Sequence, residues 1–261
     1  MKTPYLYPTD LTDAQWHCIK DLIPASKPGG RPRTLCMRAV INGILYLTVT
    51  GCQWRMLPKE YPAWQSVYAY IRRFCQDGTW RRIHETLRSR LRQRVGRHKH
   101  PTAGSLDSQS VKTAGPGIRG SDAGKRVKGR KRHILVDTLG LLLAVVVTAA
   151  SVSDPAGARQ LFKRLPGGWK KLRRLWVDGA YRGRLLDWVK THGRFLLQPV
   201  LRCDDQNGFV VLPRRWVVER TFSWITQCRR MSKDYEVKTT SSEAMIDIAM
   251  TRFMIRRLAK L

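Results

Sequence analysis

The sequence is poor in acidic residues. Only 19 of its 261 residues are Asp or Glu, against 49 Lys and Arg, so its formal net charge is +30. A chain this basic is expected to bind polyanions, because each phosphate that it neutralises releases condensed counterions. Charge alone leaves three partners open: DNA, RNA as in ribosomal-type binders, or an anionic membrane surface.

The sequence also lacks any long apolar run. Its longest, residues 139–150, is too short to span a bilayer, and we find no signal-peptide pattern. We therefore expect a cytoplasmic protein without membrane association.

Patterns that indicate disulfides or zinc sites are missing as well. The six cysteines contain no CxxC pair, and the six histidines form no HExxH motif. These spacings predict reduced, mostly buried thiols, and they argue against a zinc site.

Residues 1–96 are predicted to form a helical domain. Capping signals and apolar spacing predict helices at 12–23, 35–50, 64–76 and 79–95. Arg72 and Arg73 lie on the polar face of the third. Short helices joined by tight turns in a basic chain resemble a helix-turn-helix DNA-binding domain. The alternative is a plain helical subdomain with solvated basic faces.

A loop at residues 27–33 carries Arg31 and Arg33 between prolines and glycines that prevent regular structure. Two interpretations stay open for it: an arm that enters a DNA minor groove, or a simple linker.

Residues 105–261 follow a basic, proline-containing hinge at 97–104 and have a different pattern. Strands are predicted at 105–111, 132–137, 141–149, 174–178 and 195–198. Helices are predicted at 154–165 and 184–192, and a final helix is predicted from Thr240 onward. A further helix is predicted to start at Pro213 and to run for about five turns, with Trp216, Phe222 and Trp224 as its apolar surface. Residues 113–129 are rich in Gly, Lys and Arg and predict a flexible loop. This order predicts a mixed α/β sheet flanked by helices.

Three of the scarce acidic residues stand where catalytic chemistry needs them. Asp107 lies within a predicted strand, Asp178 ends another, and Glu219 lies in the helix that follows Pro213. Carboxylates brought together repel one another, and an oxygen-only set suits Mg²⁺ or Mn²⁺. Two such ions catalyse phosphodiester transfer in many enzymes. The structural alternatives are that Asp178 caps a turn and that Glu219 pairs with Arg215 or Arg220.

Four ordered motifs carry a resemblance to a known family. They are Ser-Leu-Asp107-Ser-Gln-Ser-Val-Lys, the segment Lys-Gly-Arg-Lys-Arg-His133 through Asp137, Val-Asp178-Gly-Ala-Tyr, and Arg215-Trp-Val-Val-Glu219-Arg-Thr-Phe. Together they resemble bacterial insertion-sequence transposases of the insertion sequence 4/5 superfamily, insertion sequence 5-like group. The wider superfamily pattern, Tyr-x2-Arg-x3-Glu-x6-Lys, is matched by Arg215, but Leu212 and Thr226 replace its Tyr and Lys.

The resemblance implies a ribonuclease H-like catalytic domain in which Asp107, Asp178 and Glu219 bind two Mg²⁺ (or Mn²⁺) ions. The implied reaction is metal-dependent cleavage at the inverted-repeat ends of an insertion sequence, with transfer of the 3′-OH ends into target DNA. We expect no small-molecule cofactor. Two alternatives are a DNA-binding protein without catalysis and a hydrolytic nuclease that cuts without joining.

The expected partner is double-stranded DNA in the bacterial nucleoid, both element ends and target. Because two ends must be held together, we expect at least a homodimer on DNA. The candidate DNA-binding residues are Arg31, Arg33, Arg72, Arg73, Lys125, Lys128, Arg130, Lys131, Arg132, Arg215, Arg229 and Arg230.

Overall fold

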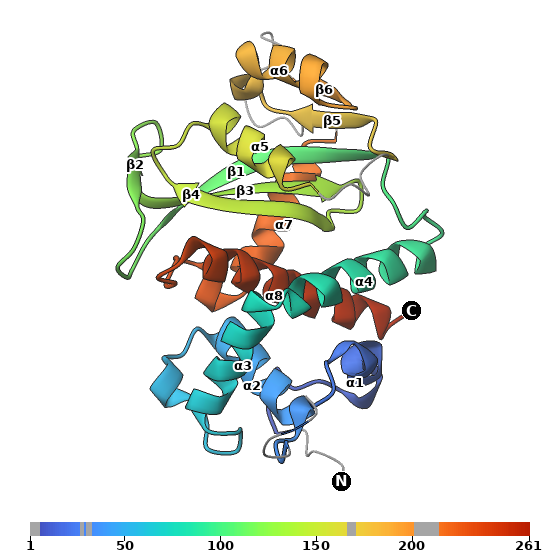
Figure 1. The fold of residues 1–261 in the computed structure, drawn as a ribbon, viewed down its shortest axis with the longest axis vertical. Helices are drawn as coiled ribbons and strands as arrows, with labels where there is room; N and C mark the ends of the chain where they lie inside the picture. Colours follow the sequence, from blue (N-terminus) through green and yellow to red (C-terminus); the bar gives the residue numbers. More distant parts are fainter. Residues whose placement is uncertain (1–5, 27–28, 30–32, 166–170, 201–213) are drawn as a thin grey trace. The chain divides into compact units, whose positions relative to one another are not determined.

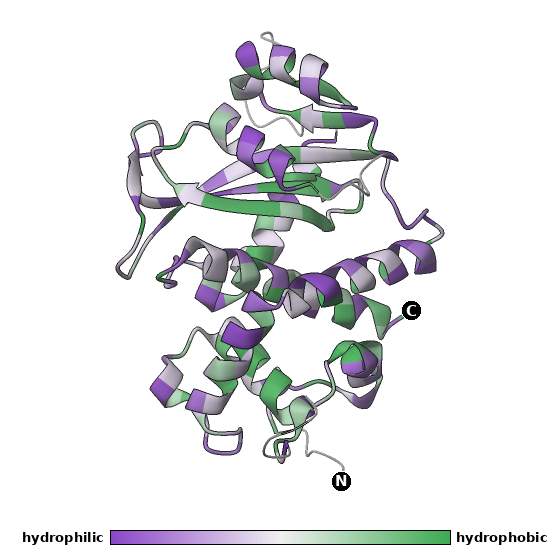
Figure 2. Cartoon of the chain, viewed as in Figure 1, coloured by the Kyte–Doolittle hydropathy of each residue, from purple (hydrophilic) through white to green (hydrophobic). Residues whose placement is uncertain are grey.

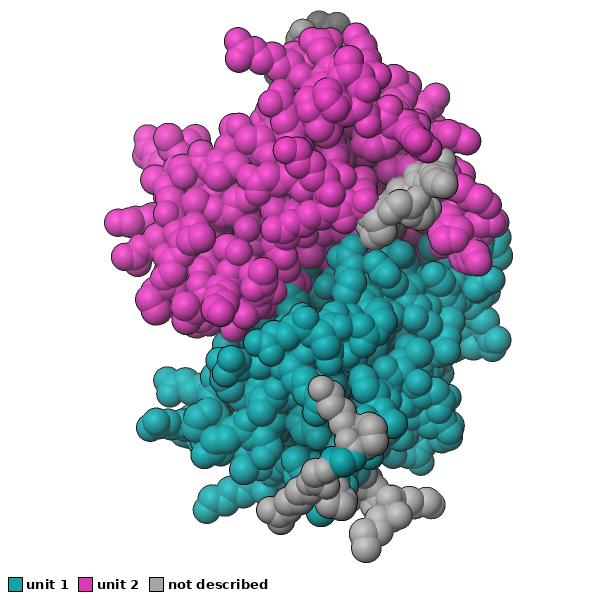
Figure 3. All heavy atoms as spheres, in the orientation of Figure 1, with its two compact units in different colours: residues 1–97, 225–232, 244–261 teal, residues 98–224, 233–243 magenta. Residues whose placement is uncertain are grey.

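The computed structural model describes residues 6–26, 29, 33–165, 171–200 and 214–261. The chain divides into two compact units, which Figure 3 colours separately. The first comprises residues 1–97, 225–232 and 244–261, and the second comprises residues 98–224 and 233–243. The domain limits given above, 1–96 and 105–261 with a hinge at 97–104, stay a prediction.

The first unit is helical (Figure 1). Its elements are α1 (Asp13–Ile19), η1 (Lys20–Leu22), α2 (Met37–Thr50), η2 (Trp54–Met56), α3 (Trp64–Gln76), α4 (Thr79–Arg94), η5 (Arg229–Met231) and most of α8 (Thr239–Leu258). All four predicted N-terminal helices are therefore confirmed. The capping box of Thr12 and Gln15 starts α1, and Gly51 ends α2 with a φ of 69°, a conformation that favours glycine.

Helix α3 has the two faces that its sequence predicts. Val67, Ile71 and Phe74 are buried, while Arg72 and Arg73 are exposed. The buried face packs this helix against α2 and α4, because apolar side chains three and four positions apart form one stripe.

The second unit is built on a six-stranded sheet. Its strands are β1 (Ala103–Lys112), β2 (Gly120–Asp122), β3 (Val127–Asp137), β4 (Leu142–Ala149), β5 (Arg174–Val177) and β6 (Leu196–Pro199). The order is β2-β3-β1-β5-β6, with β4 paired to β3. Strands β1, β5 and β6 are parallel, whereas β3 is antiparallel to β1 and β4 is antiparallel to β3. The mixed α/β prediction is confirmed, and this order fits a ribonuclease H-like sheet.

Helices α5 (Asp154–Lys163) and α6 (Arg184–His192) bury one face of this sheet. In Figure 1, α5 lies across the strands. The core joins Leu106 of β1 and Leu135 of β3 to Leu161 of α5 and Leu185 of α6. Figure 2 shows the matching hydrophobic colour along most of β4, whose first seven residues are buried.

Two expectations for this unit need correction. The predicted loop at 113–129 contains β2 and the beginning of β3, because Val127, Lys128 and Gly129 pair with β2. The helix after Pro213 was expected to run for about five turns, but α7 (Trp216–Thr226) has only 11 residues. Trp216 is 40% exposed; the buried side chains of α7 include Val217, Val218 and Phe222.

No helix in the described ranges is long and apolar enough to cross a bilayer. Of the cysteines in those ranges only Cys228 is buried; Cys36 is exposed and Cys18, Cys52 and Cys75 are intermediate. The prediction of mostly buried thiols is therefore wrong.

Candidate active site

Asp107 lies on β1, between β3 and β5. Side chains alternate along a strand. Leu106 points into the core beneath α5 and α6, and the Ser108 hydroxyl donates to Asp154 at the start of α5 over 2.7 Å. Asp107 consequently faces the opposite side of the sheet, where Ser105 donates to the backbone oxygen of Arg214.

Asp178 directly follows β5, at the carboxyl end of the strand parallel to β1. Its Oδ1 accepts from the backbone N–H of Ala180 over 3.0 Å and so caps the short turn η4 (Gly179–Tyr181). Its Oδ2 lies 3.2 Å from Nη2 of Arg215. The capping role considered above is thus present, and it uses only one of the two oxygens.

Glu219 projects from α7, and its side chain is 52% exposed. The helix is fixed to the turn between β3 and β4. Thr221 donates to the carbonyl oxygen of Gly140 over 2.9 Å, and Arg220 donates to that of Leu139 over 3.1 Å. These bonds hold Arg220 and Thr221, the two residues that follow Glu219, and so set the position of the Glu219 carboxylate.

The three carboxylates converge on a single nitrogen atom. Nη2 of Arg215 lies 3.2 Å from Asp178, 3.9 Å from Asp107 and 3.9 Å from Glu219. The segments that carry them are far apart in the sequence. The Arg215–Glu219 pair considered above is therefore one part of a three-carboxylate cluster.

Asp107 has a perturbed pKa. Burial is the largest cause and raises the pKa of this carboxyl to about 6, with a further increase from Asp178. The backbone N–H of Ser108, 2.7 Å away, and the guanidinium of Arg215 oppose that increase. A carboxylate that is costly to ionise next to other carboxylates favours the arrival of a cation.

Comparisons with known proteins agree with this geometry. A family model described as a candidate transposase of the IS4/5 family matches residues 11–84, and one described as a transposase DDE domain matches residues 98–254, more than half of the chain. The chain belongs to the insertion-sequence DDE transposases. The family resemblance noted in the motifs is confirmed.

Two relatives of this transposase come from Burkholderia cepacia. The uncharacterized 16.2 kDa protein of insertion element IS402 is 31% identical over 115 residues, which cover 41% of this chain and 76% of the relative. A candidate transposase for insertion sequence element IS402 is 28% identical over 120 residues, 41% of this chain and 54% of the relative. The crystal structure of the Mos1 Strand Transfer Complex aligns with 91% of this chain and 78% of that chain at 11% identity and a TM-score of 0.32, too low to support any conclusion.

Transposases of this family generally use divalent metal ions. Within the described ranges, no three His, Cys, Asp or Glu side chains are grouped so that they could hold a metal ion as they stand. The guanidinium of Arg215 lies among the three carboxylates instead. The chemistry of the donor set nevertheless fits, because three carboxylates provide the oxygen ligands that Mg²⁺ and Mn²⁺ prefer and they already share one positive charge.

Motif reasoning passed over a buried polar group that interacts electrostatically with Asp107. Tyr181 is 1% exposed, and its pKa is raised well above the ordinary value, first by burial and then by the carboxylates of Asp107 and Asp154. The ammonium of Lys131 lies 3.1 Å from Asp154. The signal for Tyr181 was its place in the Val-Asp178-Gly-Ala-Tyr motif, three residues after Asp178.

The structure divides the candidate DNA-binding residues of this transposase by exposure. Exposed side chains are Arg33, Arg72, Arg73, Lys125, Lys128 and Arg229, and Arg31 lies outside the described residues. Apart from Arg215, the remaining four candidates are buried, with 0 to 7% exposure. They are Arg130, Lys131, Arg132 and Arg230.

Each of the buried four has partners within the protein. Arg130 pairs with Asp234, and Lys131 lies within ion-pair distance of both Asp122 and Asp154. Arg230 lies over the ring of Trp54, 5.7 Å from its centroid. These four side chains are at most 7% exposed and have structural contacts in this structure, and phosphate binding by them stays a prediction.

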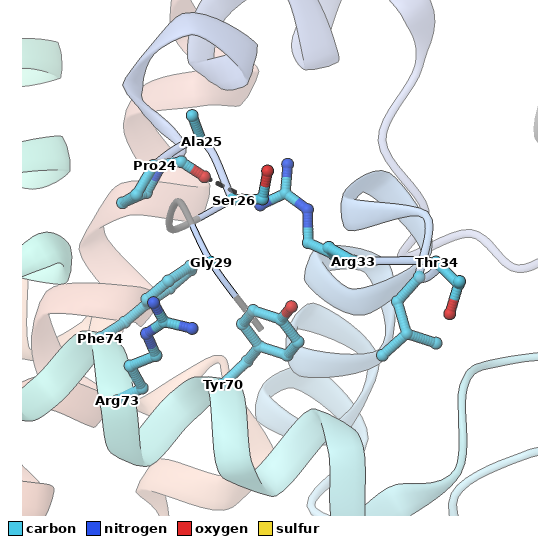
Figure 4. Close-up of a pocket in the computed structure, with 10 residues that line it drawn as sticks. Pro24, Ala25, Ser26, Gly29, Arg33, Thr34, Tyr70, Arg73 and Phe74 are labelled. Carbon is cyan, nitrogen blue, oxygen red and sulfur yellow. Dashed lines mark hydrogen bonds between the residues drawn. The ribbon is translucent and has the colours of Figure 1, made fainter. Parts of the chain in front are cut away.

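Two of the exposed arginines line one pocket of the helical unit (Figure 4). This pocket encloses about 310 Å³, and Tyr70, Arg73 and Phe74 project into it from α3. Arg33 crosses it and donates to the carbonyl oxygen of Pro24 over 2.9 Å. Cationic and aromatic groups that share a pocket suit a nucleotide, since the cation attracts phosphate and the ring stacks on bases.

Proposed function

We propose that this chain cleaves DNA at the inverted-repeat ends of an insertion sequence and transfers the freed 3′-OH ends into target DNA. The observation that carries this proposal is the convergence of Asp107, Asp178 and Glu219 on one cationic atom, within a DDE transposase domain. The net charge of +30 supports a nucleic-acid substrate.

In this proposal Asp107, Asp178 and Glu219 hold two Mg²⁺ or Mn²⁺ ions. Bound ions of this kind activate the attacking oxygen and stabilise the leaving oxygen in phosphodiester transfer. The protein contributes the positions of the ligands: β1 fixes Asp107, the N–H of Ala180 orients Asp178, and the bonds of α7 to the β3–β4 turn fix Glu219.

Phosphate binding falls to the exposed cations. Lys128 lies on β3 of the catalytic unit, Lys125 lies between β2 and β3, and the charge of Lys125 acts on Asp107. In the helical unit, Arg33, Arg72, Arg73 and Arg229 are exposed and available to the DNA backbone. We assign DNA-end recognition to this unit, in a helix-turn-helix-like manner, and at least a dimer to the DNA-bound state, because both ends must be held together.

The test uses a plasmid that carries the gene with its flanking DNA, so that the element's own ends are present. We expect Mg²⁺-dependent nicking and joining. Asp107→Asn, Asp178→Asn and Glu219→Gln should each reduce both reactions by roughly a thousandfold or more while DNA binding is retained. Asp187→Asn is the matched control, because Asp187 lies outside the four motifs and its side chain is 75% exposed on α6.

Each other outcome has a definite meaning. Cutting without joining would indicate a hydrolytic nuclease, and binding without either reaction would indicate a DNA-binding protein that has lost catalysis. Full activity in any one of the three variants would remove that residue from the proposed role.

A further inference from the structure

We propose that the guanidinium of Arg215 occupies the cation position of the Asp107–Asp178–Glu219 cluster in the metal-free protein, and that divalent ions displace it when they bind. This inference rests on the proposed function, since it takes the three carboxylates to be the metal ligands. It assigns Arg215 a role in metal binding that is separate from any contact with DNA.

The first argument is the geometry of the contacts. Arginine–carboxylate pairs are frequently bidentate, with two nitrogens of the guanidinium in parallel hydrogen bonds to one carboxylate. Here one nitrogen, Nη2, faces three carboxylates, and only the 3.2 Å contact to Asp178 has hydrogen-bond length. The two contacts of 3.9 Å, to Asp107 and Glu219, are purely electrostatic. One short contact and two long ones are the arrangement of an electrostatic counter-ion, and not of a bidentate salt bridge.

The second argument is that the guanidinium is weakly fixed. Nε of Arg215 is buried and finds no hydrogen-bond partner among the described residues. The side chain is 11% exposed, so little water replaces that missing bond. Arg215 also precedes the first residue of α7, so the helix does not need to move when this side chain does.

The third argument is charge. Three carboxylates share one guanidinium, with Lys125 the other cation that acts on Asp107. The cluster therefore keeps an excess of negative charge that a divalent ion would neutralise more fully. A Mg²⁺ ion held by these three carboxylates would need the oxygen atoms that now face Nη2. A positive guanidinium and a divalent ion repel each other, so both cannot hold these oxygens.

The exchange predicts that Arg215 competes with metal. Without DNA, Arg215→Met should bind Mn²⁺ roughly tenfold more tightly than the unaltered chain, because its competitor is gone. Arg214→Met is the matched control, because Arg214 is the preceding residue and its guanidinium lies over the ring of Trp176, 4.8 Å from the centroid. This variant should leave the Mn²⁺ affinity unchanged. Affinity is measured by calorimetry on the full chain.

A second measurement remains decisive if Arg215→Met does not fold without metal. The Nε–H signal of Arg215 is assigned in the nitrogen–proton NMR spectrum by its loss in Arg215→Lys. In the unaltered chain this signal should move during a Mg²⁺ titration, with the same midpoint as metal binding measured by calorimetry.

The outcomes separate the inference from the proposed function. If the chain binds Mn²⁺ and Arg215→Met binds it equally or more weakly, or if the Nε signal does not move, Arg215 is a permanent part of the site and the exchange is refuted. If the unaltered chain binds no Mn²⁺, or Asp107→Asn binds it as tightly, the metal role of the three carboxylates fails and the exchange fails with it.

Discussion

Nη1 of Arg130 lies 3.0 Å from Oδ1 of Asp234, and both side chains are buried. The same guanidinium donates to the carbonyl oxygens of Glu236, Val237 and Ile118. One side chain on β3 thus donates hydrogen bonds to a segment that lies more than a hundred residues later in the chain. A charge that looks available for DNA in the sequence is used to hold the catalytic unit together.

We predict that Arg130→Met lowers the free energy of unfolding by roughly 3–5 kcal/mol, because it leaves the buried carboxylate of Asp234 without its counter-charge. Chemical denaturation checks this. Lys128→Met on the same strand is the control: Lys128 is exposed, so its change should stay within about 0.5 kcal/mol. Equal denaturation midpoints for the two variants would contradict the structural role of Arg130.

The stability of the protein should depend on pH through His133. This ring is fully buried on β3, with Nε2 3.0 Å from the hydroxyl of Thr148, and burial lowers its pKa to about 4. An unfolded histidine binds a proton below about pH 6.5. Between these two values the unfolded state binds more protons at this ring, so the contribution of His133 lowers the free energy of unfolding as the pH falls from about 6.5 to 4, while the raised pKa of Asp107 acts in the opposite direction.

The full loss attributable to His133 is roughly 3 kcal/mol, reached below pH 4, with no effect above pH 6.5. Urea titrations at several pH values should show that His133→Gln lacks this decline, so its free energy of unfolding rises relative to that of the unaltered chain as the pH is lowered from about 6.5 to 4. His192→Gln, at an exposed position of α6, should keep the full decline. If the two variants decline alike, His133 is not the group responsible.

Gly157 explains why His133 fits where it does. A Cβ at this position of α5 would overlap three ring atoms of His133: Cε1, Nε2 and Nδ1. Gly157→Ala should therefore destabilise the protein by about 1–3 kcal/mol, although alanine is the better helix former. Thermal and denaturant unfolding check this, with Gly124→Ala as control, because a Cβ there only touches Asp122 at 3.7 Å. A stabilised Gly157→Ala variant would show that the ring can move aside.

Local signals in the sequence were sufficient for several elements. The limits predicted for the helices at 64–76 and 184–192 are those of α3 and α6, because apolar spacing and stop signals lie within the helices themselves. The length of α7 could not be predicted in this way. After Thr226 the chain turns into η5, and the backbone of Asp234 then pairs with Lys112 and Ala114, a long-range contact that no local signal indicates.

The same limit applies to the site. The spacing of Arg215 and Glu219 predicts a pair one helical turn apart. Nothing local indicates that Asp107 and Asp178 approach the same nitrogen, because parallel pairing of β1 and β5 creates that proximity. Likewise, the run from Lys128 to Arg132 appears solvated in the sequence, yet Arg130 and Arg132 become buried once residues 233–242 pack on β3.

The pocket of the helical unit provides the last prediction. Arg73 is exposed on α3 and faces Arg33 across the pocket of Figure 4. If Arg73 holds a phosphate, Arg73→Gln should weaken binding of any duplex to a similar degree. The slope of log affinity against log salt concentration should become shallower by about 1, since one fewer counterion is released. The slope is measured by fluorescence anisotropy on DNA with the element's ends and on a scrambled duplex.

Arg33→Gln should change the slope by a similar amount, and the double variant by about twice as much if the two arginines hold separate phosphates. Lys190→Gln serves as the control, because Lys190 is 76% exposed but outside the proposed interface, and its slope should not change. An affinity loss confined to the element's ends would assign Arg73 to base recognition instead, because phosphate contacts carry no sequence information. Unchanged slopes in both arginine variants would remove this pocket from the DNA interface and leave Arg72 and Arg229 as the exposed candidates of the helical unit among those proposed.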